Sequence, residues 1–182
     1  TDESAMRTAP ALVAARGSLA PYSAAHDERT VLWLNDADVR RTFGITRTVS
    51  LESHQQWLKA QSDLMLWAIL DQDQNHVGNV SLVITDRHCS AYLQIYLGDA
   101  AARGRGLGGA AIDAVIAHGF QGLGLNRIWL HTTRDNQSAI ALYRSRGFAE
   151  EGVDRQSVLA EGQFRDQIRW SLLGTEWMDR KS

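Results

Sequence analysis

The feature that most constrains the fold is a glycine-rich segment between a strand-like run and a helix-like run. Four glycines occur within six residues and two arginines accompany them, in the order Arg103-Gly104-Arg105-Gly106-Leu107-Gly108-Gly109. Glycine lets backbone N–H groups approach a ligand closely, and the N-terminus of the following helix carries partial positive charge. The segment therefore predicts a backbone cradle for a diphosphate.

Three other interpretations of this segment are weaker. A plain flexible turn requires neither so many glycines nor the flanking arginines. Gly104, Gly106 and Gly109 also satisfy the G-x-G-x-x-G pattern of dinucleotide sites. However, the chain after Gly109 holds one clear crossover, whereas a doubly wound nucleotide domain needs several. No Gly-Lys-Ser/Thr follows, which argues against a nucleoside-triphosphate loop.

Hydrophobic periodicity and turn signals predict a mixed α/β sheet. The expected helices cover 24–43 with a break at Asn35 and Asp36, 50–62 with Ser50 as cap, 107–120 and 136–146. The expected strands cover 64–70, 77–84, 91–97, 127–132 and 164–172. The first three strands form an antiparallel meander, and a strand, helix, strand crossover follows. Alternation along 91–97 places Tyr92, Gln94 and Tyr96 on one face of the sheet and Leu93, Ile95 and Leu97 on the other.

Composition limits the classes of function. The chain has 182 residues, of which 44% are hydrophobic, so one domain over 6–182 is expected. Residues 1–5 precede Met6 and are expected to be an added remnant or a disordered N-terminus. A net charge of −2 and a pI near 6.3 favour neither nucleic acid nor a membrane surface as partner.

Cysteine and histidine content bears on compartment and metal binding. Cys89 is the single cysteine, so an internal disulfide is excluded and a reducing, cytoplasmic location is expected. No run approaches the roughly 18 apolar residues of a membrane span. The six histidines lack paired spacing, so no metal site is expected.

Two motifs together resemble a known family. The loop Arg103-x-x-Gly106-x-Gly108 resembles the Q/R-x-x-G-x-G/A signature of the GCN5-related N-acetyltransferase (GNAT) superfamily. The segment 136–148 is similar to its N-x-x-A-I-x-L-Y-x-x-x-G-F pattern. Further segments resemble the branch of ribosomal-protein N-terminal acetyltransferases and bacterial amino-sugar N-acetyltransferases: Trp33-Leu34-Asn35-Asp36, His54-x-x-Trp57, Gly78-Asn79-Val80 and Phe164-Arg165-Asp166.

The resemblance implies a GNAT fold with a mostly antiparallel sheet of about six to seven strands, helices on both faces and a central β-α-β crossover. It also implies acetyl-CoA as cosubstrate and direct transfer of acetyl to a primary amine in a ternary complex, without an acyl-enzyme. Homodimers are common among members. The implied cofactor-binding residues are Ile95, Tyr96, Leu97, Arg103, Gly104, Arg105, Gly106, Leu107, Gly108, Gly109, Asn136 and Tyr143.

Acetyl transfer from a thioester needs a neutral amine, a polarised carbonyl and a proton for the departing thiolate. By resemblance, Tyr143 is the general acid, Asn136 contacts the coenzyme arm, and a backbone N–H near Leu97 polarises the carbonyl. Outside this motif, a half-buried core tyrosine would be the more common case. His54 is the candidate base or acceptor contact because its usual pKa suits proton transfer near neutrality, although a structural or solvated histidine is the commoner case.

The acceptor is the least determined part of the reaction. Trp33, Glu52, His54 and Gln94 are the candidate substrate contacts, with ordinary packing as the alternative for each. An amino sugar, which includes nucleotide-linked ones, ranks first. A protein N-terminus, an antibiotic or a polyamine remain alternatives, and a non-catalytic acetyl-CoA-binding module is a distant one.

Overall fold

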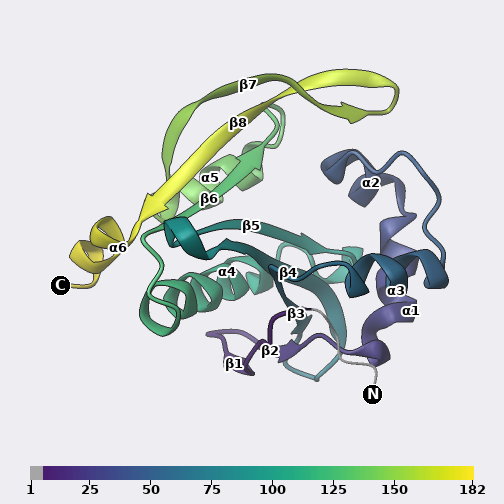
Figure 1. Cartoon of the computed structure of the whole chain (residues 1–182), viewed down its shortest axis with the longest axis horizontal. Helices are drawn as coiled ribbons and strands as arrows, with labels where there is room; N and C mark the ends of the chain where they lie inside the picture. Colours follow the sequence, from purple (N-terminus) through teal and green to yellow (C-terminus); the bar gives the residue numbers. More distant parts are fainter. Residues whose placement is uncertain (1–5) are drawn as a thin grey trace.

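The structure is a computed structural model that describes residues 6–182, so the expectation for residues 1–5 lies outside the described residues. A single eight-stranded sheet organises the chain, with helices packed on it (Figure 1). The strands are β1 Leu12–Val13, β2 Ser18–Pro21, β3 Leu64–Leu70, β4 His76–Thr85, β5 Ser90–Leu97, β6 Arg127–Thr132, β7 Ala149–Ala160 and β8 Gln163–Leu173. The helices are α1 Asp27–Leu34, α2 Ala37–Phe43, α3 Leu51–Lys59, α4 Leu107–Ala117, α5 Gln137–Ser145 and α6 Gly174–Lys181.

The strand order β1-β2-β3-β4-β5-β6-β8-β7 contains one parallel contact. All other neighbours are antiparallel, which confirms the expected meander and the β5-α4-β6 crossover. The parallel pairing of β5 with β6 ends at Tyr92 and Trp129, after only three residue pairs. Beyond that point β5 continues to Leu97 with β4 alone as its neighbour. The sheet therefore splits into two halves, and one edge of 93–97 lacks a strand partner.

Helices cover both faces of the sheet, as expected. On one face, Thr30 of α1 accepts a hydrogen bond from Asn79 Nδ2 at 2.9 Å, and Asn79 is the cross-strand neighbour of Tyr96. On the other face, α4 packs against Leu97, since a Cβ on Gly108 would lie 3.8 Å from its side chain. The alternation expected for β5 is thus present in the structure.

Local chemistry explains where the helices begin and end. Asp36 caps α2 through Asp38 N at 2.9 Å, which confirms the break expected there. Ser50 caps α3 through Ser53 N at 3.0 Å, as expected. Gly44 ends α2 with a φ of 64°, a conformation that favours glycine.

Several elements were absent from the sequence-based expectation. The sheet has eight strands, whereas the resemblance implied about six to seven. The strands β1, β2 and β7 are not among the five expected from the sequence pattern, because they carry too little apolar alternation to be recognised. The C-terminal helix α6 was also missed. The α4 helix ends at Ala117 and continues as a π-helical turn over His118–Gly122. Within residues 6–182, no helix has the length and apolar character needed to cross a membrane.

Candidate active site

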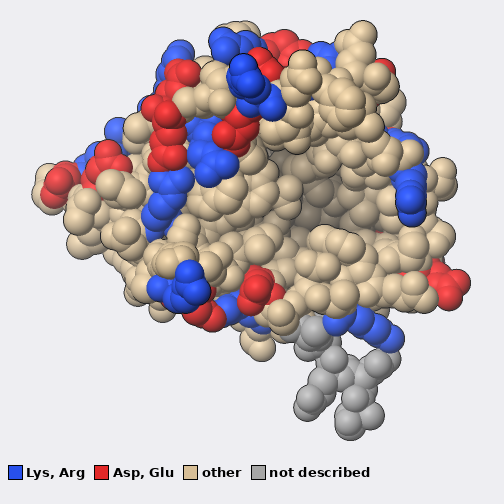
Figure 2. All heavy atoms as spheres, turned by 45° about the horizontal axis from the view of Figure 1, so that its top comes forward, with Lys and Arg blue, Asp and Glu red and all other residues tan. Residues whose placement is uncertain are grey.

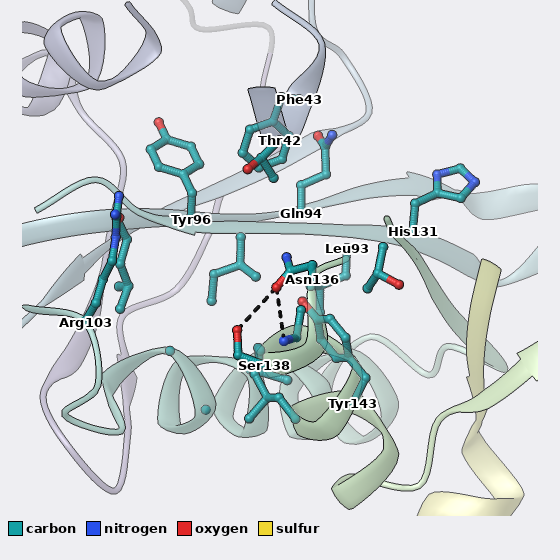
Figure 3. Close-up of a pocket in the computed structure, with 18 of the residues that line it drawn as sticks. Thr42, Phe43, Leu93, Gln94, Tyr96, Arg103, His131, Asn136, Ser138 and Tyr143 are labelled. Carbon is teal, nitrogen blue, oxygen red and sulfur yellow. Dashed lines mark hydrogen bonds between the residues drawn. The ribbon is translucent and has the colours of Figure 1, made fainter. Parts of the chain in front are cut away.

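A cleft of about 590 Å³ passes through the gap between β5 and β6. Residues from both faces of β5 line it, and Figure 3 shows Gln94 and Tyr96 on one side of the strand and Leu93 on the other. Figure 2 shows a hollow whose visible floor is formed by uncharged residues, with charged side chains around it. The cleft brings together most of the predicted cofactor contacts: Ile95, Tyr96, Leu97, Arg103, Gly104, Gly106, Leu107, Gly108, Gly109, Asn136 and Tyr143.

The glycine-rich loop forms one end of the cleft. Gly104 and Gly106 have φ values of 75° and 78°, which side chains other than glycine rarely adopt, and Gly106 is the N-cap of α4. Among the described residues, no side chain caps this helix end and no acidic side chain lies in its first turn. The first amides of α4 are therefore available to an anion, which fits the diphosphate predicted for this loop.

Arginines tie the loop to the rest of the molecule. Arg103 Nε donates to the Leu97 carbonyl at 3.0 Å, and its guanidinium lies 3.5 Å from Asp38 of α2. Arg16 donates to the Arg105 carbonyl at 3.0 Å. The Arg105 side chain does not line the cleft, so only its backbone has a visible role in shaping the loop.

Tyr143 lies deep in the cleft on α5. Its side chain is 6% exposed, and its ring packs on Phe148 with centroids 5.5 Å apart. Burial, and secondarily the nearby Tyr92, raises the pKa of the Tyr143 hydroxyl, which keeps it protonated near neutrality. No hydrogen bond to this hydroxyl forms within residues 6–182, so it is free to donate into the cleft.

The sequence suggested that Asn136 is the first residue of a helix. In the structure it is instead the N-cap of α5. Its Oδ1 accepts from Ala139 N at 3.3 Å and from Ser138 Oγ at 3.2 Å (Figure 3). The side-chain amide nitrogen of Asn136 is not used in these bonds, and Asn136 lines the cleft. Capping thus fixes the orientation of a side chain that can donate to a ligand.

A roof over the cleft comes from α2 and from the β7–β8 hairpin. Arg41 of α2 pairs with Asp38 at 2.9 Å and with Glu161 at the hairpin tip at 3.0 Å. Thr42 and Phe43 from α2 and Gln167 from β8 line the cleft beneath these ion pairs. Segments far apart in the sequence therefore enclose the same cavity.

A second cavity of about 540 Å³ adjoins the first, and Phe43, Gln94 and Tyr96 line both. It lies among α1, α3, β4 and the loop 45–49. Asn79 donates to Tyr96 Oη at 2.7 Å in its wall, and burial raises the pKa of Tyr96 to about 12. The shared residues place this cavity beside the unpaired edge of β5.

His54 lines the second cavity and is 4% exposed on α3. Its Nε2 lies 2.9 Å from Tyr22 Oη, which also donates to Asp27 at 2.8 Å. Burial lowers the pKa of His54, although Asp27 opposes this shift, so the imidazole is neutral near pH 7. Of the two alternatives considered from the sequence, this environment contradicts the solvated histidine and agrees with the structural one.

Two predicted substrate contacts line neither cavity. Glu52 is exposed on α3 and accepts from Gln56 at 3.4 Å. Trp33 packs against Gly98 and the ring of His76, with ring centroids 4.7 Å apart. Gln94 does line both cavities.

Sequence reasoning missed several lining residues. They belong to segments without a local motif: Asp38, Thr42, Phe43, Tyr92, His131, Thr133 and Gln167. Tyr92 was placed on the correct face of β5, and its hydroxyl lies 3.2 Å from His131 Nδ1. Only the alternation of β5 offered a signal for any of them.

The fold and the cleft define an acetyltransferase of the GNAT class. The family model described as an acetyltransferase (GNAT) domain matches residues 16–149, and the chain belongs to this family. Members use acetyl-CoA, which agrees with the uncapped amides of α4. A doubly wound dinucleotide domain is excluded by the mostly antiparallel sheet.

Individual relatives agree with this class. A spermidine N(1)-acetyltransferase from Vibrio cholerae is 30% identical over 115 residues, covering 63% of this chain and 66% of the relative. A putative ribosomal N-acetyltransferase, YdaF, from Bacillus subtilis is 33% identical over 78 residues, 43% of each chain. The chain thus spans at most about two thirds of these relatives.

A solved structure shows the same fold. The crystal structure of spermidine N-acetyltransferase from Vibrio cholerae in complex with CoA and spermine has a TM-score of 0.82 and 22% identity. The match covers 88% of this chain and 96% of that chain. It supports the GNAT architecture that the sequence motifs predicted.

Proposed function

We propose that the protein transfers an acetyl group from acetyl-CoA to a primary amine of a small molecule, by direct attack in a ternary complex. The observation that carries this proposal is one continuous cleft. It runs from the uncapped amides of α4, along the unpaired edge of β5, to the Tyr143 hydroxyl. These three features match the needs of a diphosphate, an extended arm and a departing thiolate.

Each part of the cleft has a role in this proposal. Acetyl-CoA supplies an activated thioester carbonyl. The amides of 106–109 hold the diphosphate, and the backbone of 95–97 pairs with the extended arm and polarises the carbonyl. Asn136 donates its amide to the same arm. Tyr143, protonated because it is buried, gives its proton to the thiolate.

The amine must lose a proton before or during attack. His54 remains the candidate base, because it lines the adjacent cavity in its neutral form. Its Nε2 faces Tyr22, so the other ring nitrogen is the one available to an acceptor or to a water. We predict that His54→Gln lowers kcat most strongly at pH values below the pKa of the acceptor amine. The affinity for acetyl-CoA should not change.

The relatives change the ranking of acceptors. Proteins named for spermidine support the polyamine alternative better than the amino sugar that ranked first. A peptide N-terminus stays an alternative through the ribosomal relative. Formation of a homodimer stays a prediction.

The test is binding followed by turnover. Calorimetry should show that acetyl-CoA and CoA bind while NAD does not, and CoA-thiol release should then depend on an added amine. Binding of acetyl-CoA with no turnover on any amine would favour the non-catalytic binding module. Acetyl retained on denatured protein would contradict direct transfer.

A further inference from the structure

The second cavity carries an unusual charge for a site that would receive a polyamine. Of the described residues that line it, only one is a lysine, arginine, aspartate or glutamate, and that residue is Arg47. The remaining walls are apolar or neutral, and the apolar ones include Leu34, Ile45, Val49, Leu64, Leu66 and Val80. A polycation would thus meet no carboxylate and one guanidinium in this cavity.

Asp27, a buried carboxylate hydrogen-bonded to Tyr22, lies outside the cavity lining. Its Oδ1 accepts from Tyr22 Oη at 2.8 Å. Its Oδ2 accepts from Gln55 Nε2 at 3.1 Å. Asp27 is therefore held in a network of the protein outside the cavity lining, and it offers no direct contact to an acceptor there.

One neutral polar group of the wall, the Asn79 amide, is satisfied within the protein. Asn79 donates to Thr30 Oγ1 at 2.9 Å and to Tyr96 Oη at 2.7 Å. Its Oδ1 lies 2.8 Å from His76 Nε2. Desolvating an ammonium is costly unless a charged or hydrogen-bonding partner replaces water. No carboxylate lines this cavity, so a second ammonium would have only neutral partners there.

Arg47 itself is free to meet a ligand. It is exposed in the loop 45–49, and no carboxylate within residues 6–182 pairs with it. Asn35 holds this loop in place, donating to the Val49 carbonyl at 2.7 Å and accepting from Val49 N at 2.8 Å. The guanidinium therefore stands on an anchored loop at the edge of an apolar cavity.

We propose that the acceptor is a monoamine with an anionic group on an otherwise uncharged body, and that Arg47 selects it over polyamines. The inference rests on the proposed function, because it assigns the second cavity to the acceptor. Arg47 pairs with a carboxylate or phosphate of the acceptor and repels a second ammonium. The single amine then lies beside Gln94 and Tyr96, next to the edge of β5.

Matched acceptors test this charge selection. Initial rates of CoA-thiol release are compared for phenylalanine against phenylalaninamide, for glucosamine 6-phosphate against glucosamine, and for spermidine. The first pair reports on a carboxylate and the second on a phosphate. Wild-type protein should show a higher kcat/KM for the anion-bearing member of at least one pair, by about threefold to tenfold, than for the partner that lacks the anion or for spermidine.

Variants then assign the effect to Arg47. Arg47→Gln should remove the preference for the anion, and Arg47→Glu should raise kcat/KM for spermidine by about tenfold. Arg155→Glu is the matched control, because Arg155 is exposed on β7 and lines neither cavity. It should leave the order of acceptors unchanged.

Calorimetry of the same acceptors with the CoA-bound protein separates the two proposals. Anion-selective binding that Arg47→Glu reverses would support the charge selection even if no acceptor were turned over. The absence of turnover would then overturn the proposal of acetyl transfer but not the charge selection. Preference of the wild type for spermidine, unchanged in Arg47→Glu, would overturn the inference. Equal binding of both members of each pair would overturn it as well.

Discussion

Replacement of Tyr143 by phenylalanine tests the proposed chemistry with little structural change. The ring stays in its contact with Phe148, and only the hydroxyl is removed. That hydroxyl has no hydrogen-bond partner within residues 6–182, so its loss leaves no buried group unpaired. The free energy of unfolding should therefore change by about 0.5 kcal/mol or less.

The expected effect on rate is much larger. A positioned proton donor contributes about 10²- to 10⁴-fold to a transfer step, so kcat should fall by that factor in Tyr143→Phe. The KM for acetyl-CoA should change little, because the diphosphate is held by α4 at the other end of the cleft. Since burial raises the pKa of Tyr143, its proton stays in place at neutral and mildly basic pH, and the loss in kcat should be constant across that range.

The assay is CoA-thiol release under saturating acetyl-CoA, with the melting temperature measured on the same samples. Tyr92→Phe is the control, because Tyr92 also lines the cleft but its hydroxyl contacts His131 at 3.2 Å. It should keep kcat within about tenfold of the wild type. A Tyr143→Phe protein with kcat within threefold of wild type would refute the role of general acid.

Three other substitutions probe the cradle and the scaffold. Gly106→Ala should weaken acetyl-CoA binding in calorimetry and destabilise the fold by about 1 kcal/mol, because residue 106 has a φ of 78° and a Cβ there would lie 3.3 Å from Arg16. Arg127 lowers the pKa of Glu151 to about 2 from 4.5, so their ion pair stabilises the fold above pH 4.5 and is lost as pH falls through 2. The melting temperature of Glu151→Gln should thus lie below that of wild type at pH 7 and converge with it near pH 2. Asp27→Asn should cost about 1–3 kcal/mol in urea unfolding, and an unchanged midpoint would contradict its role in the buried network.

The central part of the fold was predictable because each strand there has its own apolar pattern. The bounds expected for β3 and β6 are the same as those observed. The 2.0-residue alternation in β5 also assigned Gln94 and Tyr96 to one face before any contact was known. Where a strand is buried by its immediate neighbours, local sequence carries enough information.

The β7 strand shows why the rest was not predictable. Most of its residues are exposed or half-buried, since it forms the outer edge of the sheet in an extended hairpin. Its register with β8 shifts twice, and Gln156 has a φ of 48°. These irregularities interrupt the alternation that identifies a strand, although the hairpin closes the roof of the cleft through Glu161.

The two cavities also differ in how far the local sequence predicts them. The predicted diphosphate cradle depends on backbone groups, and the glycines that would permit it are close together in the sequence, so a local pattern was enough to predict it. The second cavity is assembled from α1, α3, β4, β5 and the loop 45–49, and no local pattern encodes such an assembly. The local sequence therefore carried no signal for Arg47, which the fold places in the lining of the same cavity as Gln94 and Tyr96.

The split between β5 and β6 leaves part of the β5 edge open to a ligand. Buried backbone groups need hydrogen-bond partners, yet residues 93–97 have none from β6. Arg103 satisfies the Leu97 carbonyl from within the chain. An extended ligand arm that pairs with the remaining groups would join the two halves of the sheet, which otherwise share three residue pairs. In the proposed mechanism, this edge would hold the thioester between Tyr143 and the second cavity.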